Sequence, residues 1–154
     1  MNLAATLTEP TNETRVFAAW SVVLPRPFRE DRGNAEDYWH AYDEHRSVSL
    51  TSVLVIEDGH PVSAAAIFDL LGPLEGTPVD QTPGLLGTAA IAVAEQPARA
   101  SRVLSGLIAT EGRVLVASIT SDDLDWALRV WLSIRSHPVD DRYVHGRGRR
   151  RRVH

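Results

Sequence analysis

The sequence predicts a single α/β domain, in which about three helices flank a central sheet. Its 154 residues are 44% hydrophobic and 23% charged, a balance that is typical of one globular domain. Apolar runs of strand length alternate with three segments of helical periodicity. Between two of the apolar runs stands Asp58-Gly59, which is a strong signal for a two-residue hairpin turn.

Charge and periodicity divide the chain into three parts. Residues 1–14 are polar and aperiodic and predict a flexible arm, residues 15–135 hold the periodic segments of the domain, and residues 136–154 predict a flexible basic tail. Residues 1–141 carry ten arginines and twenty acidic side chains, whereas residues 142–154 carry six arginines and no acidic side chain. The predicted domain is therefore acidic and its tail basic.

The first half of the chain predicts three strands and one helix. The apolar segment 15–24 predicts a strand that two prolines end, and Asn34 can cap a helix over residues 35–46. Helical spacing would then place four side chains on one face, namely Ala35, Tyr38, Trp39 and Tyr42. The predicted hairpin has its two arms at residues 50–57 and 60–69.

The second half of the chain predicts a loop, two strands and two helices. In chain order these are a proline-rich loop at 71–83, a strand at 85–94, a helix at 99–111, a strand at 113–120 and a helix from Asp122 or Asp123 to about Arg135. The last helix leaves few polar positions, so we expect it to be buried on most sides or to pack against a partner.

Three stretches of the sequence follow one another in an order that is typical of one enzyme family. VLVIEDGHPVSAAAI predicts the hairpin, LLGTAAIAVAEQPARASRVLSGLIATEG a strand, a loop and a helix, and RVLVASITSDDLDWALRVWL a strand and a helix. This order, at residues 50–131, resembles the GNAT family, the GCN5-related N-acetyltransferases. The pyrophosphate loop of that family reads Gln/Arg-x-x-Gly-x-Gly/Ala, and Gln96 to Ser101 align with it.

The resemblance implies a central, mostly antiparallel mixed sheet, with acetyl-CoA or another acyl-CoA as the donor. It implies cofactor contacts from six residues, which are Ile91, Val93, Gln96, Arg99, Ser101 and Arg102. Backbone N–H groups at the start of the following helix would bind the diphosphate, and Arg99 and Ser101 stand where the family has glycine. A base would deprotonate a small-molecule or protein amine, and the candidates, at strand ends, are Glu57, His60 and Glu95.

The last predicted helix leaves the activity open. The family often has Asn-x-x-Ala-x-x-x-Tyr there, and its tyrosine can protonate the leaving thiolate. In this chain Leu124 and Trp131 stand at the Asn and Tyr positions, and an indole N–H is not a usable acid. The resemblance therefore implies either an N-acetyltransferase or a relative that binds an acyl-CoA without catalysis.

The arginine-rich tail supports a different hypothesis, a nucleic-acid-associated accessory or regulatory protein, for example of a mobile element. Its clustered arginines are Arg147, Arg149, Arg150, Arg151 and Arg152. Arginines that contact the phosphates of DNA or RNA give weak, sequence-independent binding, and no helix-turn-helix or zinc-finger pattern adds specificity. The alternative is a solvated tail that lies on the acidic body.

The sequence also excludes several kinds of site. Without cysteine the chain can form no disulfide, thiolate zinc site or Fe–S cluster, and its histidines and aspartates match no spacing of a metal site. No signal peptide or membrane span is visible, so we expect a cytoplasmic bacterial protein. The apolar last helix supports a third hypothesis, an interaction or assembly subunit, and leaves a homodimer open.

Overall fold

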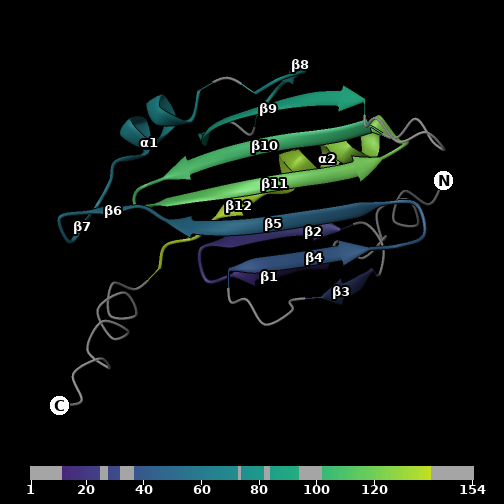
Figure 1. The fold of residues 1–154 in the computed structure, drawn as a ribbon. Coiled ribbons are helices and arrows are strands. Elements are labelled where there is room, and N and C mark those ends of the chain that lie inside the picture. Colours follow the sequence, from purple (N-terminus) through teal and green to yellow (C-terminus); the bar gives the residue numbers. More distant parts are fainter. Residues whose placement is uncertain are drawn as a thin grey trace, which may run out of the picture.

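Two layers of secondary structure make up the fold (Figure 1). The first layer is a seven-stranded antiparallel sheet, whose strands in spatial order are β3 (Arg29–Asp31), β4 (Tyr38–Tyr42), β5 (Ser47–Leu54), β11 (Arg113–Ser121), β10 (Arg102–Thr110), β9 (Leu86–Val93) and β8 (Thr77–Val79). The second layer combines helix α2 (Leu124–Ser133) with a three-stranded sheet of β1 (Asn12–Phe17), β2 (Trp20–Leu24) and β12 (Arg135–Ser136). This computed structural model describes residues 12–24, 28–31, 37–72, 74–81, 84–93 and 102–139.

The predicted fold class is wrong, because the described residues form mostly strands and only two helices. The sheet is antiparallel throughout, and the predicted helices at 35–46 and 99–111 are replaced by β4 and β10. In β4 the buried side chains of Trp39 and Ala41 alternate with more exposed neighbours, which is the period of a strand. β10 is hydrogen-bonded on both sides, by β9 and β11, and this pairing overrides its helical spacing of apolar residues. No helix among the described residues is long and apolar enough to cross a membrane.

The hairpin turn is confirmed, but the predicted second arm at 60–69 is wrong beyond its first two residues, because residues 64–71 form a helix. Asp58 and Gly59 have φ angles of 51° and 79°, the left-handed pair that a type I′ turn requires. They join β6 (Ile56–Glu57) to β7 (His60–Pro61). The chain then enters helix α1 (Ala64–Leu71), because the Ser63 hydroxyl accepts a hydrogen bond from the Ala66 backbone N–H at 3.2 Å and caps the helix.

The predictions for the remaining strands and for the last helix hold in part. The segment predicted as one strand at 15–24 is a hairpin of β1 and β2, and β1 begins within the predicted arm. The predicted strands at 85–94 and 113–120 are confirmed as β9 and β11. The last helix is confirmed as α2, with Asp123 as the N-cap. It is buried against the core, as one of the two expectations for it required.

The core lies between the two layers and contains all four tryptophans. Trp20 comes from the small sheet, Trp39 from the large sheet, and Trp126 and Trp131 from α2. The Trp131 ring lies directly on Gly106 of β10, where an added Cβ would stand 2.3 Å from a ring carbon. The Trp131 indole also donates a hydrogen bond to the Asp80 carbonyl at 3.0 Å. One face of the seven-stranded sheet is therefore filled to close packing.

Candidate functional site

The other face of the seven-stranded sheet, which we call the open face, points away from this core. Register and alternation place sixteen side chains of the four long strands on it: Ser47, Ser49, Thr51 and Val53 of β5, Val114, Val116, Ser118 and Thr120 of β11, Val103, Ser105, Leu107 and Ala109 of β10, and Leu86, Thr88, Ala90 and Ala92 of β9. None of the sixteen is charged, although 23% of the chain is.

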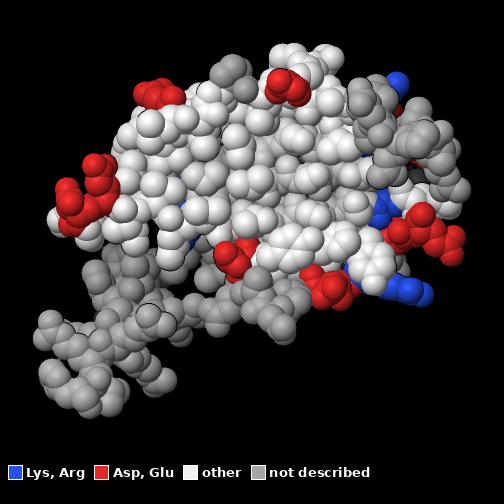
Figure 2. Space-filling view, viewed as in Figure 1, with Lys and Arg blue, Asp and Glu red and all other residues white. Residues whose placement is uncertain are grey.

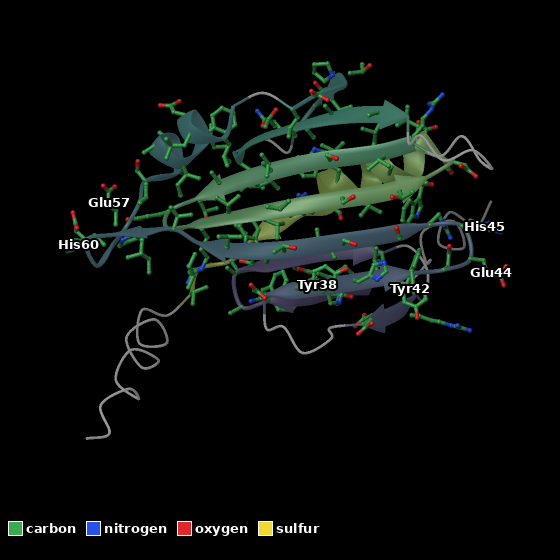
Figure 3. The ribbon with its side chains drawn as sticks, in the orientation of Figure 1. Tyr38, Tyr42, Glu44, His45, Glu57 and His60 are labelled. Carbon is green, nitrogen blue, oxygen red and sulfur yellow. The ribbon has the colours of Figure 1, made fainter. Side chains whose placement is uncertain are left out.

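Strand pairing arranges the open face in cross-strand rows that continue onto β4. From β4 to β9 the rows are Tyr38-Thr51-Val116-Leu107-Thr88, His40-Ser49-Ser118-Ser105-Ala90 and Tyr42-Ser47-Thr120-Val103-Ala92. The His40 and Tyr42 rings stack with centroids 5.1 Å apart, and the Tyr38 and His40 centroids are 6.4 Å apart. Figure 3 shows Tyr38 and Tyr42 along β4. Bulky rings thus stand on one side of the face and small side chains on the other.

Helix α1 covers one end of the open face, and no other helix or strand of the described chain covers the rest. Ile67 of α1 packs on Ala109 and Val114, which are only 2% and 5% exposed. One row further along, Val116 is 39% exposed and Tyr38 is 36% exposed. The open face therefore presents apolar side chains of the kind that the protein buries under α1.

Acidic side chains surround the uncharged face (Figure 2). The described residues contain fifteen acidic side chains against seven arginines. Among the acidic side chains are Glu57 and Asp58 on the β6–β7 turn, Asp69 on α1 and Asp37 ahead of β4. The charged side chains on this side of the molecule therefore lie at its margin, and the side chains at its centre are neutral.

The edges of the large sheet are protected against the addition of a further strand. Edge strand β8 carries Pro78, which has no N–H to donate, and the Gln81 side chain accepts the Gly87 backbone N–H at 2.9 Å. The other edge strand, β3, has only three residues, and all three are charged. A partner is therefore better accommodated on the open face than at either edge.

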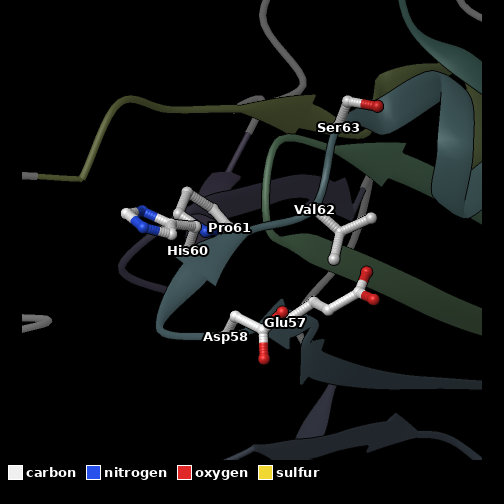
Figure 4. Close-up of a pocket in the computed structure, with 6 residues that line it drawn as sticks. All are labelled: Glu57, Asp58, His60, Pro61, Val62 and Ser63. Atoms are coloured by element: carbon white, nitrogen blue, oxygen red, sulfur yellow. The ribbon is translucent and has the colours of Figure 1, made fainter.

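Two of the three predicted base candidates lie together, on the hairpin. Glu57 and His60 are cross-strand partners in β6 and β7, and with Asp58, Pro61, Val62 and Ser63 they line an open depression of about 360 Å³. In Figure 4 the His60 ring points away from the Glu57 carboxylate. Both side chains are exposed, so nothing there desolvates a base or aligns it with a second group. The third candidate, Glu95, lies outside the described residues.

The cofactor residues implied by the family resemblance are not brought into one site. The Ile91 side chain packs against the core, and Arg102 is exposed at the start of β10. Val93 ends β9, while Gln96, Arg99 and Ser101 lie outside the described residues. Because residues 102–110 form β10 where a helix was expected, the described residues offer no helix N-terminus there to bind a diphosphate. Acyl-CoA binding stays a prediction, without that support.

A polar cluster that sequence reasoning missed lies on the small sheet. The Ser21 hydroxyl, on a residue that is 1% exposed, donates to Glu13 Oε1 at 3.0 Å and lies 2.7 Å from His137 Nε2. A hydroxyl has one proton, so His137 must be the donor to Ser21. This direction is opposite to that of a serine nucleophile and its base. The cluster fastens the segment after β12 to β2. Ser21 and His137 lie 116 residues apart, so no local pattern indicates the cluster.

A charged cluster covers the end of the core that lies at the β4–β5 turn. The Arg46 guanidinium lies 4.7 Å from the Trp126 ring centroid and 5.3 Å from that of Phe28, and it pairs with Asp43 at 2.8 Å. Burial alone would raise the pKa of Asp43. Hydrogen bonds from the Arg46 side chain and from the backbone N–H groups of His45 and Arg46, together with the Arg46 charge, more than offset it and hold that pKa below its usual value.

Comparisons with known proteins add no assignment to this geometry. No model of a protein family matches the chain, and no curated protein matches it. Among the described residues no group of three or more His, Asp or Glu side chains is arranged to hold a metal ion. The tail arginines Arg147, Arg149, Arg150, Arg151 and Arg152 lie outside the described residues. The open face is a feature of the described chain that the packing of the fold does not explain.

Proposed function

We propose that this chain is an interaction subunit that docks a protein surface on its open face. The observation that carries the proposal is the absence of charge from the thirteen of the sixteen open-face positions that are not buried, on four adjacent strands. A water-facing sheet surface normally carries charged side chains. Depletion of charge at the centre, with tyrosine enriched, is instead the composition of protein interfaces.

Exposure supports the same function. Val53, Val116 and Tyr38 are three of the large apolar side chains that remain exposed, and they lie on three adjacent strands of the open face, with Thr51 between Tyr38 and Val116. Docking a partner there would remove them from water, at about 25 cal/mol for each Å² of apolar surface. The serine and threonine hydroxyls between them can donate and accept hydrogen bonds, so they can be satisfied inside an interface. This is the third sequence hypothesis, moved from the last helix to the sheet.

Site-specific photo-crosslinking in the native cell tests the proposal. A photoreactive side chain at Ser118 lies at the centre of the open face, and one at exposed Arg129 on α2 is the matched control. We expect a discrete adduct from position 118 only. The partner in that adduct, once purified, should bind the wild-type chain and lose at least about tenfold in affinity on Val116→Arg. Equal adducts from both positions, or unchanged binding by the variant, would contradict the proposal.

The arginine-rich tail supports a second candidate function, contact with DNA or RNA. Six arginines and no acidic side chain in residues 142–154 favour phosphate binding, in contrast to the acidic body. The full chain and a variant with the five clustered arginines changed to glutamine should be compared on duplex DNA and on single-stranded RNA across salt. We expect binding that weakens with salt and is lost in the variant. Equal binding by both proteins would contradict a role for the tail.

A further inference from the structure

The open face also indicates what kind of element can dock on it. We propose that its occupant is a single amphipathic helix of a partner protein, with apolar side chains on the side that docks and lysine or arginine side chains on the flanks. This inference rests on the proposed function, because it takes the open face to be a docking surface. It adds the type of element that binds and the sign of its charge.

The part of the open face that is free among the described residues has the size of one helix. Ala90, Ala109 and Val114 are buried, and Leu107 packs in the cluster under α1. One continuous free area remains on β4, β5, β11 and the first half of β10, made of Tyr38, His40, Tyr42, Ser47, Ser49, Thr51, Val53, Val116, Ser118, Thr120, Val103 and Ser105. Strand spacing and rise make this area about 15 Å wide across the strands and about 20 Å long. A helix is about 10–12 Å wide and rises 5.4 Å per turn, so three to four turns cover most of the area.

The backbone of the sheet favours a helix over a strand as the docking element. β5, β11 and β10 are each paired on both sides, so an element that lies on this face meets side chains only. Its own N–H and C=O groups must then be bonded internally, because docking removes water from them. A helix forms these bonds within itself, whereas a single strand leaves them unpaired. Helix α1 is an example, because its Ile67 packs on Ala109 and Val114 of the same face.

The side chains of the free area suit the apolar side of such a helix. Val116 at its centre is 39% exposed, with Val53 and Tyr38 on the strands beside it. The serine and threonine side chains of β5 and β11 are short and uncharged, so a helix can approach the sheet closely there. The three rings of β4 are taller and stand along one side of these short side chains. A helix on β5 and β11 would therefore also contact the rings with its flank.

The distribution of charge around the face selects a basic helix. Among the described arginines only Arg29 has a register position on the open face, since it pairs with Tyr42. The other six lie in the second layer or on the covered side of the sheet, namely Arg15, Arg129, Arg135, Arg102, Arg113 and Arg46. The hairpin and α1 meanwhile place Glu57, Asp58 and Asp69 at the margin (Figure 2). Lysine or arginine on the flanks of a docked helix is attracted to this margin, whereas an acidic helix is repelled.

Titration of the purified full chain with two labelled synthetic helices is the first experiment. Both peptides have about 18 residues, or roughly five turns, and carry leucine along one side. The remaining positions are lysine in one peptide and glutamate in the other. We expect saturable binding of the lysine peptide only, and binding that weakens as salt is raised. Equal binding of both peptides, or of neither, would overturn the proposal.

Arginine substitutions on the two layers test where the lysine peptide binds. Val116→Arg at the centre of the free area should raise its Kd at least about tenfold. Leu132→Arg is the matched control, because Leu132 is 37% exposed but lies on α2 in the other layer. It adds the same charge and should change the Kd by less than about threefold. Equal effects would mean that the peptide binds the acidic body without a defined site, and would overturn the proposal.

Charge reversal at the margin tests the sign of the partner. Asp69 on α1 and Asp125 on α2 are both exposed acidic side chains on helices, but only α1 lies on the open face. Asp69→Arg should raise the Kd of the lysine peptide about fivefold at low salt and reduce its salt dependence. Asp125→Arg should change it by less than about twofold. Equal effects of the two reversals would contradict a role for the margin.

The partner that photo-crosslinking at position 118 captures then separates this proposal from the docking function. The crosslinked residue of the partner should lie in a helix with apolar residues at i, i+3, i+4 and i+7 and with lysine or arginine on its flanks. A crosslinked residue in a strand, in an acidic segment or in a second copy of this chain would overturn the helix, while the docking function would stand. The absence of any adduct from position 118 would remove the docking function and this proposal together.

Discussion

The two faces of the seven-stranded sheet are built by the same strands, yet they follow different rules. On the covered face of β10, Leu104, Gly106 and Ile108 are fitted to α2 so closely that the Trp131 ring occupies the space of a missing side chain. On the open face of the same strand, Leu107 packs against the cluster under α1, and no further layer of the described residues covers Ser105. The difference teaches that the fold uses one face along its whole length and the other face only at the end under α1. The composition of the rest of the second face is therefore free to serve binding.

An introduced charge should produce the largest difference in stability between the two faces. Ala117 and Ser118 are neighbours on β11, with Ala117 buried on the covered face and Ser118 on the open face. Ala117→Asp would bury an unpaired carboxylate and should cost more than about 4 kcal/mol, enough to unfold the chain. Ser118→Asp should change the free energy of unfolding of the monomer by about 0.5 kcal/mol or less. Urea denaturation of both variants measures the contrast.

Comparable losses of stability in Ala117→Asp and Ser118→Asp would contradict this contrast between the faces. They would mean that the open face is buried within a single chain. The denaturation of Ser118→Asp is best followed at low concentration. At low protein concentration, association between chains contributes nothing to the free energy of unfolding.

A change in side-chain volume should also affect stability differently on the two faces, but by less than an introduced charge does. Gly106→Val places a side chain where the Trp131 ring lies, and overpacking of this kind should cost about 3 kcal/mol. Ser105→Val, one residue earlier on the open face, adds a good strand former and should be neutral within about 0.5 kcal/mol. Thermal unfolding of the two variants measures the difference. Tolerance of Gly106→Val would show that α2 can move away from the sheet.

The sequence predicts the elements that depend on local signals. Turn geometry, capping and burial act over a few residues. The sequence therefore predicts the Asp58-Gly59 turn, the Asp123 cap of α2 and the apolar runs of β9 and β11. β10 was not readable. Its apolar residues are spaced as on a helix, and they also fill both faces of a central strand. The choice was made by β9 and β11, which pair with it from other parts of the chain.

The candidate site was harder to predict, because it depends on register across five strands. One local signal was present. Ser47, Ser49 and Thr51 alternate with Val48 and Leu50 in β5, which is the pattern of a strand with one buried face. Only the pairing of β5 with β4 and β11 shows that an uncharged row on one strand continues on the next. The predicted bases followed from strand ends in a different fold, so their positions carried no information about this face.

The smallest expected effect concerns pH, and it also distinguishes the faces. Asp43 and Arg46 close one end of the covered core against Trp126, whereas on the open face the four long strands carry no titratable group and the neighbouring β4 contributes His40 and two tyrosines. The folded pKa of Asp43 is lowered. Its contribution to stability is therefore complete above the unfolded pKa, near 3.8, and is lost as the pH falls through the folded pKa.

Asp43→Asn should therefore reduce stability at neutral pH by about 0.5–1 kcal/mol, since the amide keeps an oxygen for the backbone N–H groups but loses the charge that pairs with Arg46. Its deficit should shrink as the pH falls below 3.8 towards the lowered folded pKa, where the wild-type carboxylate becomes protonated as well. Asp122→Asn, at an exposed residue beside the α2 cap, is the control. A deficit of the same size at pH 7 and in acid would mean that shape rather than charge holds this end of the core closed.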